Sequence, residues 1–329
     1  MELLLGIDIG GTKTAVSLSK AGDSSVEIVA KAAFDSIQEP APALEKIAET
    51  AERLALENSA KLSDFSAIGV SCGGIIDSAR GVVIATPVLP LWQNVEAGKF
   101  LSERLRLPAF ILNDANACAV AEWKYGAGAG SKNMVFLTCG TGIGAGIILN
   151  GALVEGAGGA AGEFGHIRSE PFGPAGCGKS GSLEGFCSGT GIAALAKIKA
   201  LELFQSGKKC AFCAGAECLE SISAKSVADA AISGDDAALE VYETAGDHLG
   251  RGLAILIDLL NPEIVAVGSV FARAEKLLRP AMERAIAREA MPYPRSLCAV
   301  VPAKLGENVG DIAAACAALD GMENFSKIS

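Results

Sequence analysis

The amino-acid sequence predicts an α/β protein built as two duplicated lobes, and three observations support this. The chain has 329 residues, more than a single hydrophobic core usually serves. Half of the residues are apolar but only 5% are aromatic, and 39 are glycines, a composition that suits tightly packed α/β layers with many turns. The segment Ile7–Val16 (IDIGGTKTAV) repeats the strand, Gly-Thr turn and strand pattern of Leu137–Gly146 (LTCGTGIGAG), which indicates a duplication with a ligand held between the halves.

The first half of the chain is expected to begin with a meander of strands and to continue with alternating helices and strands. Glycine turns break the meander, and apolar residues at a spacing of three and four indicate helices. In order, we expect strands at Leu3–Ile9, Thr14–Leu18 and Val26–Phe34, a helix over Leu44–Ala55, strands at Ala67–Ser71 and Ala109–Leu112, and a helix at Ala117–Tyr125.

The second half is expected to alternate long helices with short strands. These are a helix over much of Asp235–Leu260, a strand at Ile264–Gly268, a helix from about Phe271 to Ala290, a strand near Leu297–Val301 and a last helix at Asp311–Leu319. We expect a smaller N-terminal lobe of residues 1–116, with a C-terminal helix 311–320 packed on it, and a larger lobe of residues 117–310.

The composition also limits the partners. A formal net charge of −10 argues against nucleic acid or an anionic membrane, because both need clustered Lys and Arg, and favours a small molecule. No apolar run is long enough to span a bilayer and no secretion signal is evident, so we expect a cytoplasmic protein whose ten cysteines form no disulfides. Cys210, Cys213 and Cys218 form a separate cluster that is a weak metal signal, and their role is left open.

Both repeated turns suit phosphate binding, because glycines let backbone N–H groups approach a polyphosphate. The first turn adds Asp8, placed to hold Mg²⁺ through water, and Gly268 ends a later strand. Each turn alone could be a hairpin without a ligand, but together they predict a nucleotide site. The predicted nucleotide-binding residues are Asp8, Gly10, Gly11, Thr12, Lys13, Thr138, Gly140, Thr141, Gly142 and Gly268.

Two other glycine-rich patterns are less consistent with their surroundings. Gly173–Ser180 matches the Walker-type phosphate loop, but Pro171 and Pro174 bracket its entry and Gly181 follows it, so no strand leads in and no helix follows. A dinucleotide fingerprint can be placed on Gly140, Gly142 and Ala145, but the segment after it looks like a strand where a helix should begin.

Polar residues near both turns suit a polyhydroxylated ligand. Asn113 and Asp114 end a buried strand and start a helix, where Asp114 could be an N-cap or a base that accepts a hydroxyl proton during phosphoryl transfer. Glu163 and His166 follow the Gly-rich stretch 156–162, and Glu184 lies shortly beyond. Each of these three residues could also be a structural or surface residue.

At these residues the sequence resembles the ROK family, which comprises repressors, open reading frames of unknown role and sugar kinases. Asp8–Lys13 and Thr138–Gly144 resemble its two phosphate loops, and Glu163–His166 resembles its Glu-x-Gly-His signature. The resemblance implies an actin-like, ribonuclease-H-like fold of two lobes with the active site in the cleft. It also implies a homodimer that phosphorylates a sugar with ATP and Mg²⁺. Asp114 would be the base, and Gly73, Gly74, Asn113, Glu163, His166 and Glu184 would bind the sugar.

One segment departs from the family pattern. The family usually follows this histidine with a Cys-x-Cys-Gly-x-x-Gly-Cys segment that binds a structural zinc together with the histidine. The equivalent stretch here has Ala175 and Ser182 at two of the thiolate positions and keeps only Cys177. We therefore expect no structural zinc at this position.

Among the functions that the resemblance allows, glucose phosphorylation is our first expectation. Kinases of N-acetylmannosamine, N-acetylglucosamine, fructose or allose are alternatives. A sugar-binding regulator would carry an N-terminal DNA-binding domain, and the first expected strand begins almost at Met1. A nucleotide-driven conformational switch would not need the sugar-binding residues.

Overall fold

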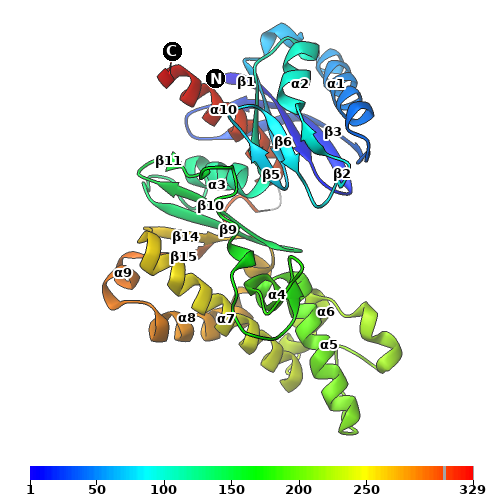
Figure 1. Ribbon diagram of the computed structural model, residues 1–329, viewed down its shortest axis with the longest axis vertical. Helices are drawn as coiled ribbons and strands as arrows, with labels where there is room; N and C mark the ends of the chain where they lie inside the picture. The colour runs from blue at the N-terminus through cyan, green and yellow to red at the C-terminus, as the bar shows by residue number, and fades with distance from the viewer. Residues whose placement is uncertain (307–308, 329) are drawn as a thin grey trace. The chain divides into compact units, whose positions relative to one another are not determined.

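The computed structural model describes residues 1–306 and 309–328, and they form two compact units (Figure 1). The first unit comprises residues 1–132 and 146–161 and the described residues from Lys304 onward. The second unit comprises residues 133–145 and 162–303. The boundary placed after residue 116 from the sequence falls within helix α3 (Asp114–Tyr125), which lies in the first unit.

The first unit is built on a mixed five-stranded sheet with the strand order β3-β2-β1-β4-β8. Its strands β1 and β2 form an antiparallel hairpin, whereas β1, β4 and β8 run parallel. The carboxyl ends of these three parallel strands therefore lie at one edge of the sheet. The strands are β1 (Glu2–Ile9), β2 (Lys13–Ala21), β3 (Val26–Asp35), β4 (Ala67–Cys72) and β8 (Ala109–Asn113).

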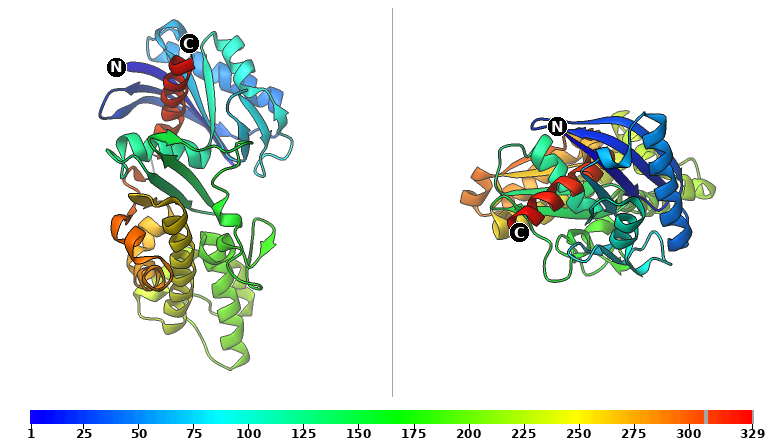
Figure 2. Two further views of the ribbon diagram at one scale, coloured as in Figure 1. Left: turned by 60° about the vertical axis from the view of Figure 1, so that its left-hand side comes forward. Right: turned by 90° about the horizontal axis from the view of Figure 1, so that it is seen from above.

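Helices cover both faces of this sheet (Figures 1 and 2). Because side chains alternate along a strand, Leu5 and Ile7 enter the core under α1 (Pro40–Glu57) and α2 (Ala97–Leu105). Leu4 instead packs in the smaller core with α10 (Val309–Ile328), which also contacts α3. The expected strands and helices of this unit are confirmed. A small sheet of β5 (Ile75–Asp77), β6 (Val82–Ala85) and β7 (Gln93–Val95) was not predicted.

The contact between α10 and the sheet depends on small residues. A Cβ on Gly69 of β4 would collide with the backbone of Ala314, and a Cβ on Gly6 of β1 would lie 3.3 Å from the Ala314 Cβ. The alanines of this helix face are almost fully buried, among them Ala315 and Ala318. The helix therefore approaches the strands closely, and a larger side chain at Gly69 would displace it.

A second mixed sheet has the strand order β11-β10-β9-β14-β15. Its strands are β9 (Met134–Cys139), β10 (Ile143–Leu149), β11 (Ala152–Leu153), β14 (Ile264–Val267) and β15 (Ala299–Pro302). Strands β9 and β10 enclose the second Gly-Thr turn as β1 and β2 enclose the first. The two-lobed α/β fold with a duplicated strand-turn-strand element is therefore confirmed.

Helices make up the rest of the second unit. They are α4 (Leu183–Cys187), α5 (Gly189–Gln205), α6 (Ala224–Ile232), α7 (Asp236–Leu260), α8 (Val270–Glu289) and α9 (Pro292–Leu297), with the hairpin β12 (Ala175–Gly176) and β13 (Lys179–Ser180). Helices α7 and α8 were predicted, whereas α5 and α6 were not. Small residues of α7 face α8. Gly246 lies against the backbone of Leu278, and Gly250 lies against the backbone of Met282.

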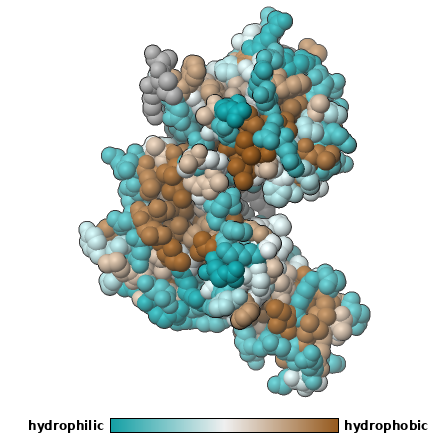
Figure 3. All heavy atoms as spheres, in the orientation of Figure 1, coloured by the Kyte–Doolittle hydropathy of each residue, from teal (hydrophilic) through white to brown (hydrophobic). Residues whose placement is uncertain are grey.

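The cysteines and the surface add two further facts. All ten cysteines are free, and the Sγ atom of Cys213 donates to the carbonyl of Gly215 at 3.2 Å. Within residues 1–306 and 309–328, no helix is long and apolar enough to cross a membrane. Apolar side chains lie between hydrophilic ones on the surface (Figure 3), and Leu259, Met291 and Tyr293 are among the most exposed.

Candidate functional site

Three of the predicted segments meet at the edge of the first sheet where the parallel strands end. Asp8 lies near the end of β1, Gly73 follows β4, and Asp114 follows β8. The strand order β1-β4-β8 makes these ends neighbours. Ligands of open α/β sheets bind outside the carboxyl ends of the strands, so this edge is where a ligand is expected.

The first Gly-Thr turn is closed by its own backbone and fastened to β3. The N–H of Gly10 donates to the carbonyl of Lys13 at 3.1 Å. Ser36, just after β3, donates from its hydroxyl to the Gly10 carbonyl at 2.6 Å, and its N–H donates to the Thr12 carbonyl at 2.9 Å. Ser36 was not among the predicted residues, because only the pairing of β2 with β3 brings it to the turn.

Asp8 is mostly buried among other carboxylates. Burial raises the pKa of Asp8 to about 6, and the negative charges of Asp311 and Asp114 add to the shift. The ammonium group of Lys31 opposes it and forms an ion pair with Asp311 at 2.7 Å. Asp311 and Lys31 were not singled out in the sequence. Carboxylate oxygens are the ligands that Mg²⁺ prefers, and Asp8 is the residue that supplies them beside the first turn.

Asn113 and Asp114 have separate roles in the local structure. Asn113 is the N-cap of α3: its Oδ1 accepts from the N–H of Ala115 at 2.9 Å, while its Nδ2 donates to the carbonyl of Gly74 at 2.8 Å. Asp114 is therefore not needed as the cap. Solvent reaches the Asp114 residue, but protein atoms surround much of its carboxyl. This burial raises the pKa of Asp114, and the hydrogen bond from the N–H of Ala115 partly offsets the rise. A Cβ on Gly73 would lie 3.4 Å from this carboxyl, so Gly73 lines it.

The second Gly-Thr turn is held by the start of α5. The carbonyl of Gly140 accepts from the N–H of Gly189 at 2.7 Å, and the carbonyl of Thr141 accepts from the hydroxyl of Thr190 at 2.7 Å. In a trans peptide the N–H points opposite to the carbonyl. The N–H groups of Thr141 and Gly142 are therefore directed away from α5, as a phosphate-binding turn requires.

Two further predicted nucleotide residues lie beside this turn. Gly268 follows β14, and its N–H donates to the carbonyl of Leu137 at 2.8 Å. A Cβ on Gly140 would lie 3.5 Å from the hydroxyl of Ser269 and 3.9 Å from that of Thr138. Gly268 and Thr138 are thus close to the turn, and Ser269 is an additional polar neighbour.

The Glu163–His166 segment turns against β10. Gly162 has a φ of +92°, and its carbonyl accepts from the N–H of Ala145 at 2.9 Å. A Cβ at this glycine would collide with the Ala145 carbonyl. The close approach presents Glu163 and His166 to solvent. The same region excludes a Walker-type phosphate loop at Gly173–Ser180. In such a loop a helix would begin at the lysine, whereas Lys179 lies in a β-hairpin and donates to the His166 carbonyl at 2.6 Å.

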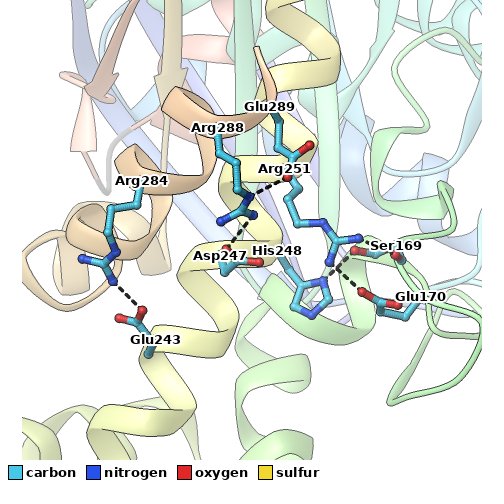
Figure 4. Close-up of polar contacts among 9 residues, drawn as sticks. All are labelled: Ser169, Glu170, Glu243, Asp247, His248, Arg251, Arg284, Arg288 and Glu289. Carbon is cyan, nitrogen blue, oxygen red and sulfur yellow. Dashed lines mark hydrogen bonds and ion pairs between the residues drawn. The ribbon is translucent and has the colours of Figure 1, made fainter.

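The segment after His166 is anchored on α7 (Figure 4). The hydroxyl of Ser169 lies 2.7 Å from Nδ1 of His248, and Arg251 forms an ion pair with Glu170 at 2.6 Å. The ring of Phe186 in α4 stacks on His248 with 3.8 Å between the ring centres. Burial lowers the pKa of His248, as does the charge of Arg251, whereas the charges of Glu170 and Asp247 oppose this shift.

The predicted site residues thus form two groups. In the first unit, Asp8, the Gly10–Lys13 turn, Gly73–Gly74 and Asn113–Asp114 gather at one sheet edge. In the second unit, the Thr138–Gly142 turn, Gly268, Glu163–His166 and Glu184 gather around β9 and β10.

The loop at the family's zinc position is held by hydrogen bonds. The hydroxyl of Ser182 accepts from the N–H of Gly176 at 3.1 Å and donates to its carbonyl at 3.0 Å. Arg168 donates to the Ser180 carbonyl at 2.9 Å. Cys187 is buried, and its thiol donates to the Ala245 carbonyl at 3.4 Å. No group of three metal-binding side chains occurs in the part of the chain that the structure describes.

The absence of a structural zinc therefore stays a prediction with a clear test. We expect the purified protein to contain far less than one zinc per chain by elemental analysis, because His166 and Cys177 offer only two ligands. Treatment with a chelator should leave the melting temperature unchanged. About one zinc per chain, lost in His166→Ala or Cys177→Ala, would contradict the prediction.

Comparisons with known proteins show to which proteins the sequence is similar. The model of the ROK family matches residues 4–320. A glucokinase of Thermotoga maritima is 34% identical over 316 residues, covering 95% of this chain and 96% of the relative. The repressor Mlc of Escherichia coli is 27% identical and covers 92% of this chain and 72% of the relative.

A solved structure extends the similarity to the fold. The ROK glucokinase of Streptomyces griseus, crystallised with glucose and AMPPNP, superposes with a TM-score of 0.76 at 29% identity. The match covers 97% of this chain and all of the other. With a family model that spans nearly the whole sequence and a shared two-lobed fold, the chain belongs to the ROK family.

Proposed function

We propose that the protein phosphorylates a hexose hydroxyl with ATP, and that glucose is its preferred acceptor. The observation that supports this proposal is the shared sheet edge of the first unit, where the Asp8 turn at the end of β1 and the carboxyl of Asp114 after β8 lie on either side of the end of β4. One edge thus offers a base for the acceptor hydroxyl and a turn for the phosphate. The similarity to glucokinases supports glucose.

Asp114 acts as the general base in this proposal. As the sugar oxygen attacks the γ-phosphorus, the hydroxyl proton passes to the Asp114 carboxylate, the new O–P bond forms, and the bond to the β-phosphate oxygen breaks to release ADP. The pKa of Asp114, raised by burial, makes its carboxylate a stronger base than an exposed aspartate. Asn113 fixes the start of α3 and so the direction of the base.

The proposed phosphate contacts are the Gly10–Lys13 turn of the first unit and the Thr138–Gly142 turn of the second unit. The Gly10–Lys13 turn offers a hydroxyl and an ammonium group, and Thr138–Gly142 offers the N–H groups that α5 directs outward. Asp8 is placed to hold Mg²⁺ through water, and a bound Mg²⁺ would neutralise charge on the phosphates. Asn113, Glu163, His166, Glu184, Gly73 and Gly74 are the proposed sugar contacts.

The acceptor sugar, the location, the oligomeric state and a second candidate function are finer points of the proposal. N-acetylmannosamine, N-acetylglucosamine, fructose and allose are alternative acceptors, because the pocket residues do not distinguish them. The chain is expected to act in the cytoplasm, where ATP is available, and as a homodimer, which sedimentation velocity would test. Similarity to Mlc makes a sugar-binding regulator the second candidate function.

A coupled assay of ADP formation over these five sugars tests the proposal. We expect turnover with at least one hexose and little hydrolysis without sugar. Hydrolysis that is independent of sugar would favour a nucleotide switch. Sugar binding without any turnover would favour the regulator.

A further inference from the structure

Glu184 joins two backbone segments of the second unit. Its Oε2 accepts from the N–H of Ile143 at 2.8 Å, and its Oε1 accepts from the N–H of Cys177 at 2.7 Å. The hydroxyl of Ser182 caps α4 by accepting from the N–H of Gly185 at 3.2 Å, which fixes where this short helix begins. The carboxylate is therefore aimed at the second Gly-Thr turn by the local fold.

The approach of Glu184 to the turn is close. A Cβ on Gly142 would lie 2.5 Å from Oε2, so a side chain at this position would push the carboxylate away from the turn. Ile143 directly follows the Gly-Thr turn. Its N–H is held by Glu184, while the carbonyls of Gly140 and Thr141 are held by α5. Three successive peptide groups are thus fixed, and the carboxylate supplies the only charged partner among these three hydrogen bonds.

Each carboxylate oxygen can accept more than one hydrogen bond, so a sugar hydroxyl can also donate to Glu184. We infer that Glu184 is a positioning residue for the phosphate-binding turn and that, through this role, it couples sugar binding to nucleotide binding. The inference rests on the proposed function, because it takes ATP and a hexose as the ligands. A hydroxyl that orders the carboxylate also orders the turn, so each ligand should bind more tightly when the other is present.

The test uses Glu184→Gln in the full-length protein. The two N–H groups donate to different carboxylate oxygens, and in Gln an NH₂ donor replaces one of them, so one of the two N–H groups would face another donor. We expect the variant to bind the Mg²⁺ complex of adenosine 5′-(β,γ-imido)triphosphate about tenfold more weakly without any sugar, measured by titration calorimetry. A residue that only contacts sugar would not change this affinity. Glu184→Asp, one methylene shorter, serves as the second variant if Glu184→Gln does not fold.

Glu163→Gln is the matched control. Glu163 is an exposed carboxylate of the same unit and a proposed sugar contact, and the Ile143 N–H is held by Glu184 instead. We expect this control to raise the KM for the best hexose of the panel while nucleotide affinity without sugar stays unchanged. The best hexose should tighten nucleotide binding in the wild type and in Glu163→Gln, but not in Glu184→Gln.

The outcomes are distinguishable. Wild-type affinity for the analogue in a folded Glu184 variant would overturn the positioning role while leaving the kinase proposal intact. Unchanged coupling between the ligands in Glu184→Gln would overturn the coupling. A wild-type protein that binds neither the analogue nor a hexose would overturn both the inference and the proposed function.

Discussion

Asp114→Asn is expected to lower kcat by a factor of about 10² to 10⁴, the usual contribution of a positioned general base. Asparagine keeps the size of the side chain but cannot take the proton of the sugar hydroxyl. The start of α3 should persist, because Asn113 provides the cap. Steady-state kinetics with the best hexose, together with calorimetric sugar binding, measure the effect, and we expect the sugar affinity to change little.

Asp236→Asn provides the matched control for this variant. Asp236 is also the first residue of a helix, α7, and is exposed. The same change in charge and helix position is made there without touching the proposed base. Near-normal turnover in Asp114→Asn, with a folded protein, would show that another group accepts the proton.

Asp8→Asn is expected to reduce kcat/KM for MgATP by about 10² or more while making the protein more stable, because the carboxylate is costly to bury but is needed near the phosphates. The folded-state pKa of about 6 lies above the ordinary value of 3.8. The folded protein therefore binds this proton more tightly than the unfolded chain. The stabilisation of the wild type that comes from the bound proton is fully present below pH 3.8 and is lost as the pH rises through about 6. At pH 7.5 the neutral asparagine should gain about 1–3 kcal/mol in the free energy of unfolding.

The pH dependence separates this effect from general damage. The stability advantage of Asp8→Asn in urea titrations should shrink as the pH falls through about 6 and disappear below pH 3.8, where the wild-type carboxyl becomes protonated in both the folded and the unfolded state. In the wild type, kcat/KM for MgATP should fall as the pH drops through about 6. Glu27→Gln, at an exposed carboxylate near the start of β3, should change neither property. A destabilised Asp8→Asn at pH 7.5 would contradict the electrostatic argument.

Much of the fold could be predicted because its strands and helices have clear patterns of apolar residues and glycines within single segments. Apolar runs separated by turns at Gly10–Gly11 and Gly22 identified β1, β2 and β3, and helical spacing identified α1, α7 and α8. Strands β5 to β7 are only three or four residues long, too short for an alternating pattern to be recognised. Helix α5 is apolar on most sides, so its periodicity gives little signal.

The candidate site was predictable where its chemistry lies in one segment. The Asp8 turn and the Asn113–Asp114 pair could be identified from adjacent residues. Contacts between distant segments could not: Asp311 is 303 positions from Asp8 in sequence, since 311 − 8 = 303, yet its charge raises the pKa of that carboxyl. For Glu184 the sequence suggested only a sugar contact, because its bond to Ile143 exists only once α4 packs beside β10.

The close packing of α10 on the first sheet has a consequence for how the protein is made. A ribosome synthesises β1 and β4 long before α10. The sheet face at Gly6 and Gly69 therefore stays uncovered until α10, with Ala314, has been translated. The second unit, residues 133–145 and 162–303, is complete before that point. The unit that carries Asp8 and Asp114 therefore finishes folding last, and nascent chains stalled before residue 309 should be bound by chaperones and cleaved readily by protease in their N-terminal sheet.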